Sequence, residues 1–299
     1  MTVAITTVEP TMFELPEWMA NPERRPGAGV FGLVFEFRDQ RLGGDPGPKK
    51  IVRVLPGKVE SIAWHESLRA RLRKLSELTL PYVSLPQEVF ELGDGRLALI
   101  GSLFREPLAA RIGGERGAEF TTGESDAVVR QLLVALSGLH SNGVAHGDVR
   151  PQNIFLADDA DGRPTVWLGD AAIGSLTWLS GGEMLDREAC FYFPPEWKGQ
   201  TQAPNPQADV VALGLSLAEL FLGRSGNPQR FRSDSDGVPN FDGISARLAK
   251  SQASSATKRL IGKLVTSNHE DRLADGTAAL SYWERLQQEA QWFRRLRHW

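Results

Sequence analysis

The stretch from residue 146 to residue 153 carries the side chains best suited to chemistry. It reads His-Gly-Asp-Val-Arg-Pro-Gln-Asn, which places Asp148 five positions before Asn153. An aspartate held beside an incoming hydroxyl can accept its proton, and an asparagine can turn its carbonyl oxygen toward a metal ion. The spacing therefore predicts a loop that combines a general base with a metal ligand.

A second carboxylate follows at Asp170, after two short predicted strands. The first strand covers residues 154–156, Asp161-Gly162 marks a tight turn, and the second strand covers residues 165–168. A carboxylate at that strand end, facing the loop, is where a phosphate-bound magnesium would need an oxygen ligand. We therefore expect Asn153 and Asp170 to be the metal ligands.

These residues resemble the protein kinase family, with residues 146–153 as the catalytic loop and Asp170 as the metal-binding aspartate. The resemblance implies an α+β, bilobal protein-kinase-like fold. Residues 1–20 would be a lead-in, residues 21–104 a small β-rich N-lobe and residues 105–299 a larger helical C-lobe. It further implies that Asp148 is the catalytic base and that Arg150, which stands where serine/threonine kinases have lysine, stabilises the transferring phosphoryl group.

The resemblance also assigns contacts to ATP. The run from residue 27 to 34 is a full G-x-G-x-x-G-x-V, whose glycines let the backbone approach phosphates, although a glycine-rich hairpin turn would read the same. Glu66, on a predicted helix over residues 61–78, would pair with the cation on the strand 51–55, or would be a surface carboxylate on that helix. The positions that would contact the nucleotide are Gly27, Gly29, Gly32, Val34, Arg53, Glu66, Gly101, Leu103 and Phe155.

Departures from the family pattern gather at the nucleotide. Arg53 stands where the family has its phosphate-binding lysine, and the planar guanidinium is larger than an ammonium. Ile51 replaces a small alanine, and Phe155 would be a bulky floor beneath the adenine. Asp170-Ala171-Ala172 replaces D-F-G, and Gly147 replaces the arginine of H-R-D. Asp148, Asn153 and Asp170 are nevertheless present together.

Three elements of the predicted C-lobe resemble structural motifs of the family. Residues 192–196 resemble the A-P-E end of an activation segment, and Glu196 would pair with Arg272. Asp209 begins a buried helix and would hold the backbone of the catalytic loop. Farther on, Trp283, Leu286, Ala290, Phe293 and Leu296 mark one face of a long helix. A basic cluster of Arg294, Arg295, Arg297 and His298 lies beside that face and is explained by a solvated helix end or by a partner or nucleic-acid patch.

Composition limits the class of protein. The chain has 299 residues, 41% hydrophobic and 24% charged, with a net charge of −3, so no overall basic field points to nucleic acid. The one cysteine, Cys190, excludes an internal disulfide and suits a reducing compartment. No signal-like start and no membrane segment are recognisable, so we expect a cytoplasmic protein.

Three functions stay open at this stage. The first is an ATP- and magnesium-dependent kinase that acts on serine or threonine hydroxyls of a protein substrate. The second is a pseudokinase, a regulatory module that binds a protein partner and whose nucleotide site is degenerate at Ile51, Arg53 and Asp170-Ala171-Ala172. The third is phosphorylation of a small molecule, or transfer of the nucleotide itself, on the same fold. The sequence leaves the oligomeric state open.

Overall fold

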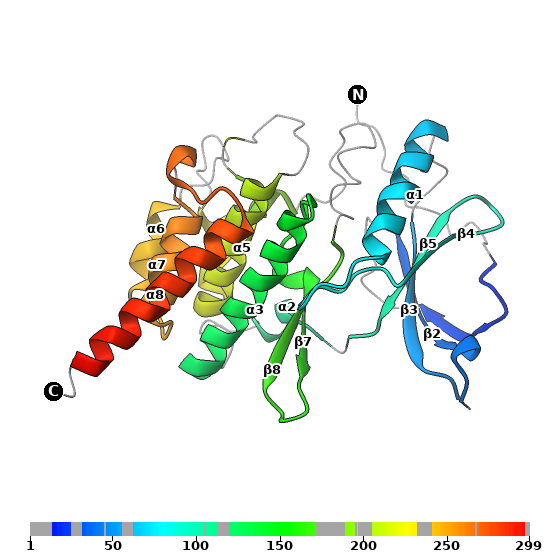
Figure 1. The fold of residues 1–299 in the computed structure, drawn as a ribbon, viewed down its shortest axis with the longest axis horizontal. Coiled ribbons are helices and arrows are strands. Elements are labelled where there is room, and N and C mark those ends of the chain that lie inside the picture. The colour runs from blue at the N-terminus through cyan, green and yellow to red at the C-terminus, as the bar shows by residue number, and fades with distance from the viewer. Residues whose placement is uncertain are drawn as a thin grey trace. The chain divides into compact units, whose positions relative to one another are not determined.

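In the computed structural model the chain forms two compact units, Met1–Leu78 with Leu85–Leu103, and Thr79–Ser84 with Phe104–Trp299 (Figure 1). The structure describes residues 14–24, 32–44, 46–55, 62–104, 106–112, 120–171, 189–194, 196, 205–231, 241–266 and 268–296. The predicted phosphate-loop glycines Gly27 and Gly29 lie outside these residues, as does most of the segment after Ala171.

The first unit is built on a five-stranded antiparallel sheet in the order β1-β2-β3-β5-β4. Strands β2 (Leu33–Asp39) and β3 (Lys49–Val54) pair along their length, and β5 (Leu97–Ser102) lies between β3 and β4 (Glu88–Glu91). Alternate residues such as Val52 and Val54 are buried, which is the period-2 burial of a sheet with one packed face. The predicted strand at residues 51–55 is therefore confirmed as β3.

The N-terminal boundary of this unit differs from the prediction of a lead-in that ends at residue 20. Strand β1 (Met19–Arg24) already begins at Met19, whose side chain is buried in the core of the sheet, and Leu15 and Trp18 pack against that core. Burial of these apolar side chains stabilises the packing of the segment before residue 21 against the sheet. Strand β1 ends at Arg24, just before Pro26, which has no backbone N–H to give to a sheet.

Helix α1 (Ile62–Ser76) is the predicted helix of the first unit. Leu72 and Leu75 are buried, whereas Glu66 is exposed. The basic residues Arg73 and Lys74 lie in its last turn, where they complement the partial negative charge of the helix end.

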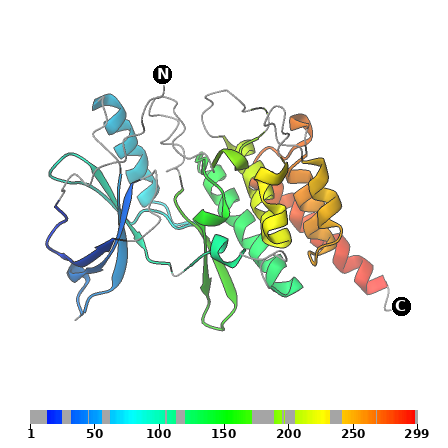
Figure 2. The ribbon, with the colours of Figure 1, turned by 180° about the vertical axis from the view of Figure 1, so that it is seen from behind.

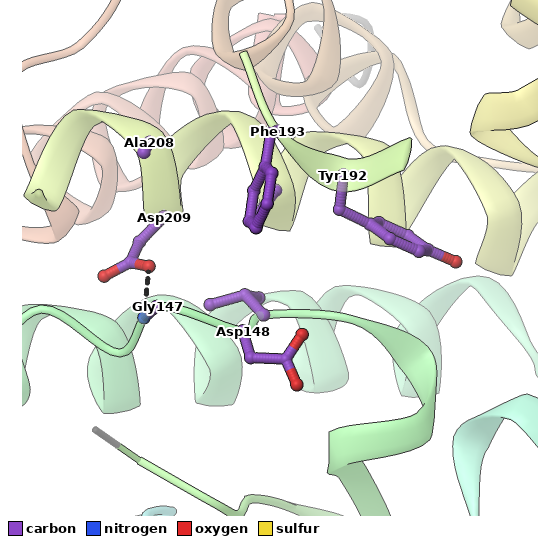
Figure 3. A pocket seen from close by; sticks show the side chains of 8 residues that line it. Gly147, Asp148, Tyr192, Phe193, Ala208 and Asp209 are labelled. Atoms are coloured by element: carbon purple, nitrogen blue, oxygen red, sulfur yellow. Dashed lines mark hydrogen bonds between the residues drawn. The ribbon is translucent and has the colours of Figure 1, made fainter. Parts of the chain in front are cut away.

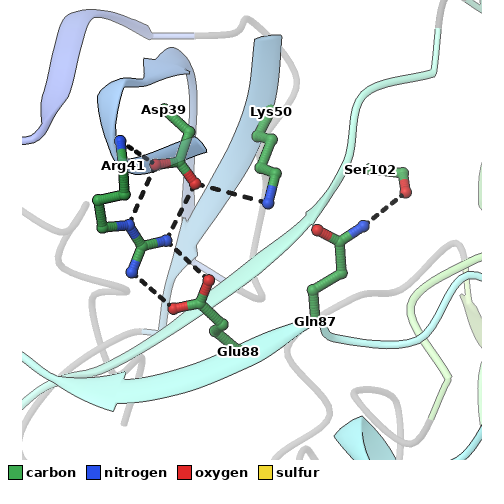
Figure 4. Close-up of polar contacts among 6 residues, drawn as sticks. All are labelled: Asp39, Arg41, Lys50, Gln87, Glu88 and Ser102. Atoms are coloured by element: carbon green, nitrogen blue, oxygen red, sulfur yellow. Dashed lines mark hydrogen bonds and ion pairs between the residues drawn. The ribbon is translucent and has the colours of Figure 1, made fainter. Parts of the chain in front are cut away.

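A polar cluster at Asp39 ties strand ends of this unit together (Figure 4). The buried Asp39 carboxylate accepts hydrogen bonds at 3.0 Å from Nε and from Nη2 of Arg41, which lies in the 3₁₀ turn η1 (Gln40–Leu42), and Lys50 Nζ lies 3.5 Å away. Arg41 also binds Glu88 at 2.7 Å and stacks over the Trp18 ring at 3.4 Å. These hydrogen bonds from Arg41 hold the pKa of Asp39 below its ordinary value. The cluster joins β2, β3, β4 and the segment before β1.

The second unit contains a three-stranded sheet, β6-β7-β8, and a set of helices (Figure 2). Strand β6 (Glu106–Pro107) pairs with β7 (Ile154–Asp158), which pairs with β8 (Pro164–Leu168). The tight turn predicted between the last two strands is present, with Gly162 at φ 74°. The short 3₁₀ turn η2 (Pro151–Asn153) leads directly from the predicted catalytic loop into β7.

Two long helices form the centre of this unit. Helix α3 (Thr122–Ser141) begins with a capping box, in which Thr121 and Glu124 satisfy each other's backbone N–H groups. Helix α5 (Pro206–Leu222) has Asn205 as its N-cap and is buried over almost its whole length. The remaining elements are α2 (Leu108–Arg111), η3 (Ala189–Tyr192), η5 (Gly223–Gly226), η6 (Pro228–Phe231), α6 (Asp242–Leu248), α7 (Ser255–Leu264), η7 (His269–Asp271) and α8 (Gly276–Leu296).

The predicted apolar face of α8 is buried along only part of the helix. Trp283 and Leu286 are buried, Ala290 is half-buried, and Phe293 and Leu296 are exposed. The face therefore continues beyond the helices that cover its first turns. Among the described residues, no helix combines the length and the apolar character needed to cross a bilayer.

Candidate active site

The predicted catalytic loop lies between the end of α3 and the start of β7, and its backbone is held from α5. Asp209, in the first turn of α5, accepts hydrogen bonds from the backbone N–H groups of His146 at 2.6 Å and Gly147 at 2.8 Å. Figure 3 shows the bond from Gly147. Asp209 is 2% exposed, so these bonds form in a water-poor interior where they fix the backbone firmly. The predicted role of Asp209 is confirmed.

His140, which the sequence reading did not single out, completes the surroundings of Asp209. Its Nδ1 accepts a hydrogen bond from the backbone N–H of Gly276 at 2.8 Å, so Nε2 carries the proton. That Nε2–H donates to Asp209 at 3.0 Å. The Asp209 carboxylate therefore binds both the catalytic loop and His140 at the end of α3, and His140 in turn binds the start of α8. No local sequence pattern indicates this role, because His140 and Asp209 are 69 positions apart.

The Asp148 carboxylate is held by two neighbours from its own loop. Arg150 Nε lies 3.0 Å from one carboxylate oxygen, and Asn153 Nδ2 donates to the other at 2.7 Å and to the Asp148 carbonyl at 2.9 Å. Both partners of Asn153 are acceptors, which fixes the orientation of its amide and makes its carbonyl oxygen the atom that can ligate a cation. All three predicted loop residues are thus together, each less than 8% exposed.

Gly169, the residue before Asp170, forms two hydrogen bonds with the loop. Its N–H donates to the backbone carbonyl of Asn153 at 2.8 Å, and its own carbonyl accepts from His146 Nε2 at 2.8 Å. His146 Nδ1 accepts from the Asp148 N–H at 3.1 Å, so the ring is in its neutral form with the proton on Nε2. Burial lowers the pKa of His146, in keeping with that form. His146 is both a core histidine and the link between the loop and Asp170.

Asp170 adopts a backbone conformation that few residues take. Its φ is 59°, in the left-handed region, where aspartate is among the better-tolerated residues other than glycine. The described residues contain no group of three or more His, Cys, Asp or Glu side chains arranged for a metal. A cation here would be bound by Asp170, by the side-chain Oδ1 of Asn153, and by phosphate and water oxygens. Mg²⁺ accepts such a set of oxygen ligands.

Phe155 lies against the same segment. Its ring stacks on Phe104 with centroids 5.0 Å apart, and a Cβ on Gly169 would lie 2.6 Å from Phe155 Cε2. Only glycine fits at 169 while this ring is present. The stacking partner Phe104 gave no signal in the sequence, because the contact joins residues 51 positions apart.

A small pocket borders the loop on the side of α5. It is lined by Gly147, Asp148, Val149, Tyr192, Phe193, Ala208, Asp209 and Ala212. In Figure 3 the Phe193 ring points toward the catalytic loop. The Tyr192 hydroxyl donates to Glu219 of α5 at 2.5 Å, and Asn227 donates to the other oxygen of Glu219 at 3.1 Å. Burial and the Glu219 carboxylate raise the pKa of Tyr192 well above its ordinary value.

The predicted ion pair of Glu196 and Arg272 is present. Two guanidinium nitrogens of Arg272 contact the two carboxylate oxygens of Glu196, at 2.5 and 3.1 Å. Arg272 is 6% exposed and also donates to the Thr266 carbonyl at 2.8 Å. This bidentate contact fixes the end of the segment that carries Tyr192 and Phe193.

Three of the predicted nucleotide contacts of the first unit, Val34, Arg53 and Gly101, lie on its sheet. Val34 and Arg53 are partners in the β2–β3 register, and Ile51 is the partner of Gly101 in β5. Gly32 has φ 112°, and a Cβ there would lie 2.1 Å from the Val54 carbonyl oxygen, so this position requires glycine. Leu103 is half-buried. Binding of a nucleotide by these residues, and pairing of Arg53 with Glu66, remain predictions.

Comparison with known proteins settles the family. A model of the protein kinase domain matches residues 21–288. The chain belongs to the protein kinase family. The kinase domain of Mycobacterium tuberculosis PknI superposes with a TM-score of 0.63 at 18% identity over 91% of this chain and 100% of that one, which supports the kinase fold. Rad53 1-466 in complex with AMP-PNP superposes with a TM-score of 0.63 at 17% identity, over 88% of this chain and 65% of that one.

Curated relatives include serine/threonine-protein kinases. PknL of Mycobacterium tuberculosis is 32% identical over 99 residues, which are 33% of this chain and 24% of PknL. The cell division control protein 2 homolog 2 of Trypanosoma brucei brucei is 30% identical over 67% of this chain and 55% of that protein. The matched region of this kinase-family chain thus spans about a quarter of PknL and about half of the trypanosome protein.

Proposed function

We propose that this kinase-family chain is an active, magnesium-dependent protein kinase that transfers the γ-phosphoryl group of ATP to a serine or threonine hydroxyl. The observation that carries the proposal is the hydrogen-bonded connection of the loop to the Asp170 segment through Gly169, because it holds base and metal ligand in one rigid arrangement. The relatives among serine/threonine-protein kinases support this choice of acceptor.

In the proposed reaction the hydroxyl oxygen of the acceptor bonds to the γ-phosphorus, and the bond from that phosphorus to the β,γ-bridging oxygen breaks, which releases ADP. Asp148 orients the hydroxyl and accepts its proton. Arg150, paired with Asp148 at 3.0 Å, places a permanent positive charge where the transferring phosphoryl group needs it. A magnesium ion held by Asp170 and Asn153 would neutralise the charge of the phosphates.

The test is incorporation of label from γ-labelled ATP into the chain itself or into a generic protein acceptor. We expect Asp148→Asn to lower the rate by about a thousandfold, because the amide cannot take the proton. Asp158→Asn, at an exposed carboxylate at the end of β7, is the matched control and should leave the rate unchanged. Equal rates for Asp148→Asn and the parent chain would refute the assignment of the base. Retention of label from the α-phosphate would instead indicate transfer of the nucleotide.

One observation favours a pseudokinase as the second candidate. Ile51 lies opposite Gly101 in the register, and a Cβ on Gly101 would lie 3.6 Å from Ile51 Cγ1. A branched side chain therefore occupies the sheet surface beside Gly101, a predicted nucleotide contact. Thermal unfolding with millimolar ATP separates the candidates, because a ligand that binds only the folded chain raises its stability. A magnesium-dependent rise that Asp170→Ala abolishes supports the kinase, and no rise supports the pseudokinase.

A further inference from the structure

The last turns of α8 expose an apolar surface that no function described above uses. Trp292 is 58% exposed, Phe293 56% and Leu296 50%, and among the described residues they account for three of the four exposed large hydrophobic side chains. The rings of Trp292 and Phe293 contact each other edge-on, with centroids 5.0 Å apart. We call these three residues the distal α8 patch.

The distal α8 patch is not a side effect of packing within its unit. The first turns of α8 bury Ala279, Trp283 and Leu286 against neighbouring helices, α3 and α7 among them. In Figures 1 and 2 the last turns extend past those neighbours. A helix that leaves its core ordinarily becomes polar on all sides, since exposed apolar clusters favour association. Here large apolar side chains instead become more frequent.

The sequence from residue 290 onward adds charge of one sign only. The last acidic residue of the chain is Glu289, and its carboxylate is paired with Arg259 at 2.7 Å. Beyond it the sequence contains Arg294, Arg295 and Arg297 and no Asp or Glu. At 3.6 residues per turn, Trp292, Leu296 and Phe293 span an arc of about 100°, and Arg295 lies about 60° beyond the Trp292 end of that arc. The chain as a whole carries a net charge of −3, so this positive region is local.

We propose that the distal α8 patch binds the surface of an anionic phospholipid bilayer. A tryptophan prefers the headgroup level, leucine and phenylalanine side chains insert at the boundary of the acyl chains, and arginine binds lipid phosphate. Two other occupants fit less well. A second copy of the chain in a symmetric contact would bring the arginines of both copies together, and nucleic acid would leave the aliphatic and aromatic surface without an apolar partner.

The test is flotation of the 299-residue chain with vesicles, using phosphatidylcholine alone or mixed with about one-third phosphatidylglycerol. We expect binding to the anionic vesicles only, and weaker binding as salt is raised. Trp292→Ser with Phe293→Ser should lower the binding constant at least about tenfold. Arg294→Gln, Arg295→Gln and Arg297→Gln together should lower it on the order of a hundredfold.

The controls separate lipid binding from loss of structure. Leu42→Ser changes a side chain of similar exposure, 57%, in the other unit and should leave binding unchanged. All variants should melt within about 2 °C of the parent chain, because Trp292, Phe293 and Arg295, like Leu42, are exposed. Absence of binding at millimolar anionic lipid would overturn the proposal, as would full binding by the serine variant. Dimer formation or DNA binding that requires the patch, without vesicle binding, would assign it to that other partner.

Discussion

The catalytic loop of the second unit and the sheet of the first unit differ in how many residues of the family pattern they retain. Asp148 and Asn153 of the loop and Asp170 after β8 are all retained, and hydrogen bonds of Asp209, His146 and Gly169 connect the residues around them. On the sheet, Ile51 and Arg53 replace the family's alanine and lysine, although the strands pair regularly. The groups predicted to handle the acceptor and the metal are therefore constrained by buried hydrogen bonds. The groups expected at the nucleotide lie on paired strands, and strand pairing tolerates a change of side chain.

The largest effect is expected at Asp209. Asp209→Ala leaves the buried N–H groups of His146 and Gly147 and the His140 ring without their acceptor, and should cost about 4 kcal/mol of unfolding free energy. Urea denaturation measures this loss. Asp158→Ala, at an exposed position, is the control and should change stability by less than about 0.5 kcal/mol. A small loss at Asp209 would show that the loop does not depend on this carboxylate.

The next largest effect is expected at Asp39, and it tests whether a buried carboxylate stabilises the first unit as Asp209 stabilises the second. Asp39→Asn weakens the bonds from Arg41 and removes the attraction to Lys50, and should cost about 2 kcal/mol. Because the pKa of Asp39 is lowered in the folded chain, its contribution is present above the unfolded pKa near 3.8 and is lost as the pH falls through the lower folded value. Urea denaturation at neutral pH measures the cost. Glu23→Gln, on an exposed part of β1, should have no such effect.

His146 in the catalytic loop should also lower the unfolding free energy of the chain in mild acid. The folded pKa of His146 lies below 6.5, so the unfolded chain takes up its proton first and stability falls as the pH drops below 6.5. The contribution approaches about 1.4 kcal/mol per pH unit between the unfolded and folded values. Urea denaturation at several pH values measures it. A His146 ring that shows the protonated chemical shift by NMR at the start of this interval would contradict the neutral form inferred from its hydrogen bonds.

Arg53→Lys tests the substituted sheet directly. If the guanidinium is a poorer phosphate ligand than the family's lysine, the variant should bind Mg-ATP about tenfold more tightly, which is about 1.4 kcal/mol. Calorimetric titration measures the change, and Arg38→Lys on the neighbouring strand β2 serves as the control. Unchanged or weaker binding would mean that Arg53 is itself adapted to the phosphate, and the contrast between the two regions would disappear.

The smallest effect is expected from Tyr192→Phe. The change removes the hydrogen bond to Glu219 and should cost about 1 kcal/mol. It should also raise KM for a protein acceptor more than it lowers kcat, because Tyr192 lines the pocket beside Asp148. Tyr282→Phe, on the half-buried part of α8, provides a comparison. An equal drop in both constants for Tyr192→Phe would place the residue in the chemical step.

The sequence predicted elements better than contacts between them. Strands β2, β3 and β5 and helices α1 and α3 follow local signals such as alternating apolar residues and the capping box at Thr121. The pairings of Asp209 with the loop and of Glu196 with Arg272 came from family resemblance, since no local pattern joins residues more than 60 positions apart. His140, Glu219 and Phe104 were missed because each acts through a distant partner. The exposed end of α8 was missed because helical periodicity does not reveal where the neighbouring helices stop.

The close contact between Gly169 and Phe155 has a consequence for how this chain can vary. Since a methyl group at 169 would overlap the Phe155 ring, the two positions are not free to change independently. Gly169→Ala should be strongly destabilising alone and tolerated with Phe155→Leu, which gives a negative coupling free energy in a double-mutant cycle. Among natural relatives, a bulky residue at 169 should therefore occur only with a small one at 155. Phe155, which departs from the family pattern, would then be inherited together with Gly169.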